Sequence, residues 1–66
     1  MDGKEDLYDL KRSFKIGQLF NVSCVQRRMM WCYNRARRTI DLALNIGDAE
    51  EVKRDGLHMK YQFIKR

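Results

Sequence analysis

The sequence predicts a single small domain over residues 1–66 that is mostly α-helical, with a helix-turn-helix-like core, one long central helix and a C-terminal β-strand. Three observations lead to this fold class. The chain of 66 residues contains no proline and only 4 glycines. Through its middle, apolar residues recur every third or fourth position, as they do on one face of a helix. In its tail they alternate with polar residues, as they do on a half-buried strand.

The first predicted element is a helix over Asp2–Arg12. Asp2 can cap it, and Glu5 and Asp6 lie near its start, where negative charge is favourable for the helix dipole. Lys11 lies near its end, where positive charge is favourable. The apolar stripe of this helix consists of Leu7, Leu10 and Phe14.

The second predicted element is the long helix, over Val22–Ile46. Asn21 precedes it and is expected to take the positive-φ position of a turn, because asparagine tolerates that conformation best after glycine. Gly47 is a normal helix stop. The apolar periodicity continues across the whole segment, through Val22, Val25, Met29, Cys32, Ala36, Ile40 and Ala43.

The last two predicted elements are a short helix and a strand. The helix covers Asp48–Arg54, with Asp48 as its cap and Gly56 after its end. The strand covers Leu57–Ile64, where apolar and polar residues alternate. One strand is not stable alone, so this strand is expected to pair either with the short segment Ser13–Ile16 or with a second copy of the chain.

The charge balance favours an anionic partner. There are 14 Lys and Arg against 9 Asp and Glu, which gives a net charge of +5. Such a surface suits nucleic acid, an anionic membrane or an acidic protein. No apolar stretch approaches the ~20 residues of a membrane span, and no leader is visible. These features predict a cytoplasmic protein without a membrane partner, located in the host cytoplasm if the chain is viral.

The sequence carries no pattern typical of a catalytic or cofactor site. It has no nucleophile–base pair, phosphate loop or metal signature, and a deep pocket would consume much of so small a core. On one helix, Cys24 and Cys32 would lie ~12 Å apart, which is too far for a disulfide. Together with His58 they match no metal-ligand spacing. We therefore expect no enzyme activity, cofactor or metal, and two small buried thiols.

The stretch "KIGQLFNVS", residues 15–23, has the pattern of two helices joined by a tight turn. Ile16 and Gly17 supply the apolar and small residues expected in a first helix. Phe20 precedes the turn, and Ser23 follows it as a helix cap.

This stretch resembles the opening of the mercury-resistance-regulator and excisionase group of winged-helix proteins, over about residues 13–31. Members of that group often carry an "IGE" start and a "GVS" turn. Here the two motifs lie closer together, and Arg27 replaces a core residue. The resemblance implies a DNA-binding winged helix whose groove-facing residues are Ser23, Cys24, Val25 and Arg28.

If the long helix is continuous, four arginines surround Trp31. A 100° step per residue places Trp31 opposite the apolar stripe, with the arginines within about 50° of it. No acidic residue occurs between Ser13 and Thr39. Arginine binds phosphate and guanine edges in bidentate fashion, and tryptophan can stack or wedge. The four arginines are Arg27, Arg28, Arg35 and Arg38.

The sequence therefore predicts a small basic DNA-binding transcriptional regulator that contacts duplex DNA through the long helix and forms a homodimer. Two alternatives stay open. A small phage- or virus-like protein could bind and inhibit an acidic host protein through Trp31 and the basic face, since Trp and Arg dominate binding hot spots. The arginine face could also be merely solvated. The predicted DNA-binding residues are Ser23, Gln26, Arg27, Arg28, Trp31, Arg35, Arg38 and Lys60.

Overall fold

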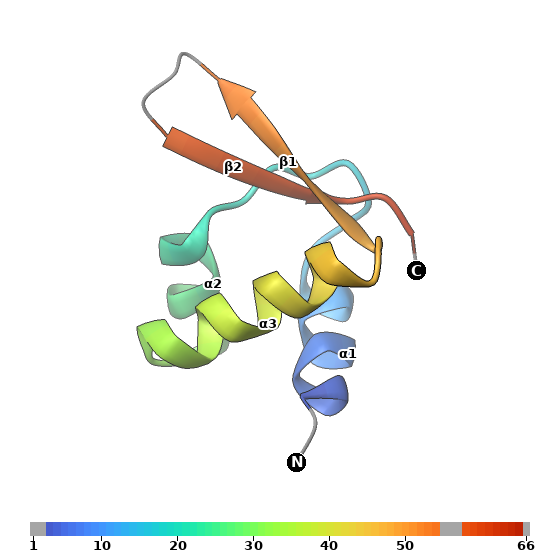
Figure 1. Cartoon of the computed structure of the whole chain (residues 1–66). Helices are drawn as coiled ribbons and strands as arrows, with labels where there is room; N and C mark the ends of the chain where they lie inside the picture. The colour runs from blue at the N-terminus through green and yellow to red at the C-terminus, as the bar shows by residue number, and fades with distance from the viewer. Residues whose placement is uncertain (1–2, 55–57, 66) are drawn as a thin grey trace.

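Three helices and a two-stranded antiparallel sheet form the structure, a computed structural model that describes residues 3–54 and 58–65. Figure 1 shows the strand pair lying across one side of the helices, with the N-terminus on the opposite side. The prediction of a small, mostly helical fold is confirmed. In chain order the elements are α1 (Lys4–Ser13), α2 (Val22–Met29), α3 (Tyr33–Asn45), β1 (Ala49–Arg54) and β2 (His58–Phe63).

The single long helix predicted over Val22–Ile46 is not confirmed, because α2 and α3 occupy this segment instead. Met30 adopts the left-handed conformation, with φ 58° and ψ 37°, through which a right-handed helix cannot continue. The Trp31 N–H then closes α2 by donating to a carbonyl oxygen of its last turn at 3.2 Å. The break has a packing consequence. It turns Trp31 into the core, where only 9% of the side chain is exposed.

Asn21 caps α2 in place of the predicted Ser23, which lies within the helix, and Asn21 does not take the predicted positive-φ position. Its φ is −132°, in the extended region, and its side-chain oxygen accepts a hydrogen bond from the Cys24 N–H at 2.8 Å. Asparagine is among the best N-cap residues because its short side chain can reach an unpaired N–H of the first turn. Among the described residues, the positive φ outside glycine belongs to Met30.

The short helix predicted over Asp48–Arg54 is wrong, because this segment forms the strand β1. Ala49, with 5% of its surface exposed, pairs with Phe63 at the start of the ladder. The segment has helix-start charges but no apolar stripe that could bury a helix. As a strand it satisfies the backbone of β2, which would otherwise present an open edge.

The strand predicted over Leu57–Ile64 is confirmed as β2, apart from Leu57, which lies outside the described residues. It pairs within the chain on both edges. On one edge it meets β1. On the other, Tyr61 and Phe20 exchange two backbone hydrogen bonds of 2.9 and 2.7 Å, and Ile16 forms a bridge with Phe63. The alternative of pairing with Ser13–Ile16 therefore holds only at Ile16.

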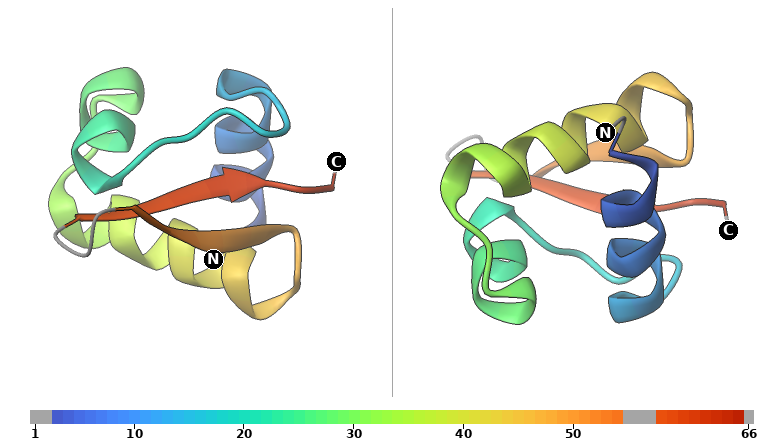
Figure 2. Two further views of the ribbon diagram at one scale, coloured as in Figure 1. Left: turned by 90° about the horizontal axis from the view of Figure 1, so that it is seen from above. Right: turned by 90° about the horizontal axis from the view of Figure 1, so that it is seen from below.

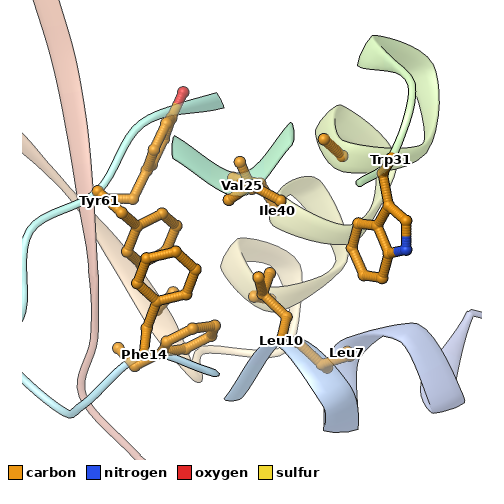
Figure 3. Close-up of a cluster of buried hydrophobic side chains, with 12 residues drawn as sticks. Leu7, Leu10, Phe14, Val25, Trp31, Ile40 and Tyr61 are labelled. Carbon is orange, nitrogen blue, oxygen red and sulfur yellow. The ribbon is translucent and has the colours of Figure 1, made fainter. Parts of the chain in front are cut away.

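The hydrophobic core lies between the helices and the strand pair. The Phe20 ring stacks on Phe14 at 4.8 Å and lies 5.2 Å from the Phe63 ring. Figure 3 shows this aromatic group at one end of the core, with Trp31 at the other end and aliphatic side chains between them. Alanines at Ala36 and Ala43, both at most 1% exposed, let α3 approach its neighbours closely.

A candidate nucleic-acid interface on α2 and α3

The turn between α2 and α3 spans three residues and leaves one face of α3 directed outward. The inward face of α3 buries Ala36, Thr39, Ile40 and Ala43. Since side chains repeat every 3.6 residues, the opposite face is fixed. Its centre carries Asn34, Arg38, Asp41 and Asn45, of which Asp41 is half-buried and the others are exposed.

Arg35 faces α1 and is bound there. Its Nη2 donates to Asp6 Oδ1 at 2.8 Å and its Nε donates to Asp6 Oδ2 at 3.1 Å, a bidentate pair. The guanidinium also lies 4.6 Å from the centre of the Trp31 ring. The hydrogen bond lowers the pKa of the Asp6 carboxyl and raises the pKa of Arg35. Arg35 therefore links α3 to α1 and covers Trp31.

Arg37 is bound on the other flank of α3. Its Nη1 donates to the hydroxyl oxygen of Tyr61 at 2.8 Å, and its Nε lies 3.4 Å from Asp41 Oδ1. The hydrogen bond to Tyr61 raises the pKa of Arg37. This residue, which the sequence prediction did not include, joins α3 to β2.

Arg38 is exposed and uncommitted. Within residues 3–54 and 58–65 its side chain makes no hydrogen bond or ion pair, although its charge helps to lower the pKa of Asp6. Asn34 lies four residues earlier, is also exposed, and likewise has no hydrogen-bond partner in the described part of the chain. Residues four apart on a helix are surface neighbours, so these two side chains form one polar unit.

The predicted residues on α2 are divided between two directions. Ser23 and Arg27 are exposed, and Arg27 forms no hydrogen bond or ion pair among the described residues. The Arg28 guanidinium instead lies 5.4 Å from the centre of the Phe14 ring. Gln26 is half-buried, and Val25, which the resemblance implied would face the groove, is buried in the core. The predicted single arginine face is therefore absent, since the turn at Met30 separates the arginines of α2 from those of α3.

Trp31 was predicted at the centre of that arginine face, and this placement is wrong. The side chain belongs to the core, because the break at Met30 rotates it inward. Lys60 is half-buried on β2, and by strand alternation it lies on the face opposite the buried Tyr61. It therefore faces away from the helices and does not join the outward face of α3.

A shallow groove beside α3 marks where acidic side chains begin next to the basic ones. It measures about 580 Å³ and lies between the start of α1 and the C-terminal half of α3. Three carboxylates line it, Glu5, Asp6 and Asp41, together with the guanidinium groups of Arg35 and Arg38. Phosphate is repelled by the carboxylates, so this groove bounds the basic surface.

Both cysteines are free thiols, but they are exposed at Cys24 and Cys32, so the prediction of buried thiols is wrong. Cys32 precedes α3 as its N-cap and gives it no side-chain hydrogen bond. Among the described residues, no three His, Cys, Asp or Glu side chains come together as metal ligands would. None of the described helices is long and apolar enough to cross a bilayer.

Comparison with known proteins gives no match: no protein-family model, curated protein or solved structure is similar to this chain. The candidate interface therefore rests on its own residues. Sequence reasoning missed Asn34, the exposed Tyr33 beside it, and Arg37. The four-residue spacing of Asn34 and Arg38 could have indicated Asn34, but only if a separate helix had been predicted to begin at Tyr33.

Proposed function

We propose that the protein is a small DNA-binding transcriptional regulator in which α2, the three-residue turn and α3 act as a helix-turn-helix. In this unit two helices are joined by a short turn, and the second helix enters the major groove of duplex DNA with its N-terminal residues near the bases. Here the second helix is α3. Its outward face starts at Asn34 and includes Arg38.

The observation that carries this proposal is the free basic surface on the two helices. Five arginines lie on α2 and α3, and no acidic residue lies between Asp9 and Asp41. Two of these arginines, Arg27 and Arg38, are exposed and have no partner among the described residues. Uncommitted guanidinium groups can bind phosphate or bases without first breaking an internal ion pair.

The position of the β-strands agrees with a winged form of this motif. In Figures 1 and 2 the Arg54 end of β1 and the first turn of α3 lie toward the same end of the molecule. The segment Phe14–Asn21 bridges to β2. A hairpin in this position would contact the DNA backbone next to the groove that α3 enters. The helix that the sequence predicted around Ile16 and Gly17 is not formed, because both residues lie between α1 and α2, where Ile16 bridges to Phe63 of β2. The proposed helix-turn-helix therefore uses a later segment of the chain, α2 and α3, than the stretch at residues 15–23.

Inhibition of an acidic host protein receives less support. That hypothesis used Trp31 as the anchor of the interface, and the side chain is 9% exposed. A hot-spot tryptophan must reach a pocket on its partner. The case for a homodimer is also reduced, because β2 pairs within the chain. A dimer remains part of the proposal. A monomeric mass at high micromolar concentration would contradict it.

The test of DNA binding is fluorescence anisotropy of a labelled duplex of random sequence at about 50 and 200 mM salt. Each phosphate contact contributes about −0.9 to the slope of log affinity against log salt, so four to six contacts would weaken binding by about 10²–10³-fold over this range. Combining Arg27→Ala with Arg38→Ala should weaken binding and reduce the slope.

Lys65→Ala, which removes one positive charge, is the control for Arg27→Ala and Arg38→Ala measured singly. Lys65 is exposed near the C-terminus, which lies at the opposite end of the molecule from the first turn of α3. It should leave the affinity nearly unchanged. No binding at the lower salt concentration would contradict the proposal, and so would equal losses for the arginine variants and the lysine control.

A further inference from the structure

Along α3, the polar side chains on the two flanks are bound, and two on the outward face are free. Arg35 is bound to Asp6, and Arg37 is bound to Tyr61 and Asp41. Asn34 and Arg38 are free of hydrogen bonds and ion pairs within the described residues. The two bound arginines hold α3 in place, while the two free side chains remain available to a ligand.

Asn34 and Arg38 also share one direction. Both lie opposite the buried residues Ala36 and Ala43, and four residues separate them. At 1.5 Å per residue they are about 6 Å apart along the helix axis. Base pairs in B-DNA are about 3.4 Å apart along one strand. A helix lying along the groove would therefore present these two side chains to bases about two steps apart.

The two residue types match the two best-defined base contacts in the major groove. An asparagine amide can donate to N7 and accept from N6 of adenine, and an arginine can donate to both O6 and N7 of guanine. The first turns of a recognition helix are where such contacts occur. Beyond Arg38, the carboxylates of Asp6 and Asp41 face the groove beside α3 and oppose further approach of phosphate.

We propose that Asn34 and Arg38 are the specificity-determining pair, reading an adenine and a guanine that lie about two base-pair steps apart. The inference rests on the proposed DNA-binding function and extends it from affinity to sequence preference. Arg35 does not share this role, because it is stacked on Trp31 and paired with Asp6.

The asparagine amide accepts and donates at the same time, so its orientation matters. In the described structure no internal partner fixes it. Rotation of the terminal amide is then free to suit the base, and N7 of adenine receives the NH₂ group while the amide oxygen receives the N6 hydrogen. Arg38 needs no such adjustment, because all its polar hydrogens are donors.

The experiment is selection from a randomised duplex library by the full chain, followed by sequencing of the bound duplexes. We expect an enriched site that contains the adenine and guanine at this spacing. Asn34→Ala should remove the adenine preference alone and Arg38→Ala the guanine preference alone. Each should lower discrimination at its own position by about 5- to 150-fold, the range for one bidentate base contact.

Two further variants separate base reading from phosphate binding and from folding. Arg38→Lys keeps the positive charge but loses the planar bidentate fork, so the guanine preference should fall while affinity for random duplex is retained. Ile64→Ala alters an exposed residue that lies outside α2 and α3 and should leave the selected site unchanged. Helical circular dichroism equal to that of the original chain confirms that each variant folds.

The outcomes distinguish the two proposals. If random duplex is bound but no site is enriched, or the enriched site lacks the adenine and guanine pair, the assignment of Asn34 and Arg38 is overturned and the DNA-binding proposal stands. If the enriched site is the same for Asn34→Ala and Arg38→Ala as for the original chain, the assignment is likewise overturned. If no duplex is bound at low salt, the proposed function fails, and the assignment fails with it.

Discussion

At the scale of single residues, Trp31 is a core residue that lies outside the helices and strands. It lies in the turn between α2 and α3 and joins the core cluster, with the guanidinium of Arg35 stacked on its ring at 4.6 Å. Figure 3 shows the indole directed toward α1, next to Leu7. Trp31 therefore fixes how the turn and α1 meet.

We predict that Trp31→Ala destabilises the fold by about 3–5 kcal/mol, the usual cost of removing a large buried side chain and leaving a cavity. Urea denaturation followed by circular dichroism measures the free energy of unfolding. Tyr33→Ala is the control, because Tyr33 is 55% exposed and should cost much less. A loss below about 1 kcal/mol for Trp31→Ala would contradict the packing described for this residue.

Asp6 provides a pH-dependent contact at the same scale. Its hydrogen bond with Arg35 lowers the pKa of the carboxyl below the ordinary value of 3.8. The contact therefore stabilises the fold above the unfolded pKa and is lost as the pH falls through the lower folded pKa. The effect is small because both side chains are partly solvated.

We predict that the difference in melting temperature between the original chain and Asp6→Asn is positive at neutral pH and shrinks as the pH falls below about 4. Thermal melts at several pH values give this difference. Asp9→Asn serves as the control, since the Asp9 carboxylate forms no hydrogen bond or ion pair in the part of the chain that the structure describes. A difference between the original chain and Asp6→Asn that is independent of pH would contradict the role given to Asp6.

At the scale of elements, the break between α2 and α3 depends on an unusual residue. Met30 holds a left-handed conformation that costs a residue with a Cβ about 1–2 kcal/mol, and its side chain is 87% exposed. Burial of the methionine side chain therefore does not offset this cost. The compensation comes from Trp31, which the turn directs into the core.

Met30→Gly should accordingly stabilise the fold by about 0.5–1 kcal/mol, because relief of the left-handed strain exceeds the extra entropy of glycine in the unfolded chain. The denaturant midpoint measures this change. Met30→Ala retains the strain and should be close to neutral. If Met30→Gly lowers the denaturant midpoint, the left-handed conformation of Met30 does not destabilise the fold as proposed.

The elements also show what local sequence information can predict. The first helix, the start of the second at Val22, the end of the helical region near Gly47 and the tail strand were all predicted with boundaries within about two residues. Each has a local cause, such as the Asn21 cap or the alternation in the tail. The failures, which are the helix expected around Ile16 and Gly17, the turn at Met30 and the strand β1, have tertiary causes.

At Met30 no glycine or proline marks the turn, and the apolar spacing continues through it from Met29 to Cys32. Only the burial of Trp31 distinguishes the two helices from one. The segment of β1 has charges typical of a helix start, but its pairing strand, β2, comes later in the chain. Strand pairing of this kind depends on context more than on intrinsic preference.

The candidate site was predicted in part for the same reason. Arg27 and Arg38 were identified from charge alone and are exposed. Trp31 was misplaced because the direction of its side chain depends on the turn at Met30. Asn34 was missed because the residue where α3 begins decides which side chains share a face with Arg38. Composition thus predicted an anionic ligand, which stays a prediction, while geometry was needed to select the candidate contact residues.

At the scale of the whole molecule, charge is distributed unevenly. Acidic and basic residues balance one another in number on α1 and on β1, whereas the charged residues of α2 and the first half of α3 are all basic. Such an asymmetry orients the molecule in the field of a polyanion, so that encounters occur preferentially through the helical unit.

The central claim is that duplex DNA binds to the outward face of α3. The most direct measurement is an NMR titration of the isotope-labelled chain with duplex DNA, in which amide and side-chain signals are followed residue by residue. We predict changes at Tyr33, at the side-chain amide of Asn34 and at Arg38, with little change at Ile46 and Ile64 near the other end of the molecule. Changes confined to those isoleucines or to α1, or no change in any signal, would contradict the claim.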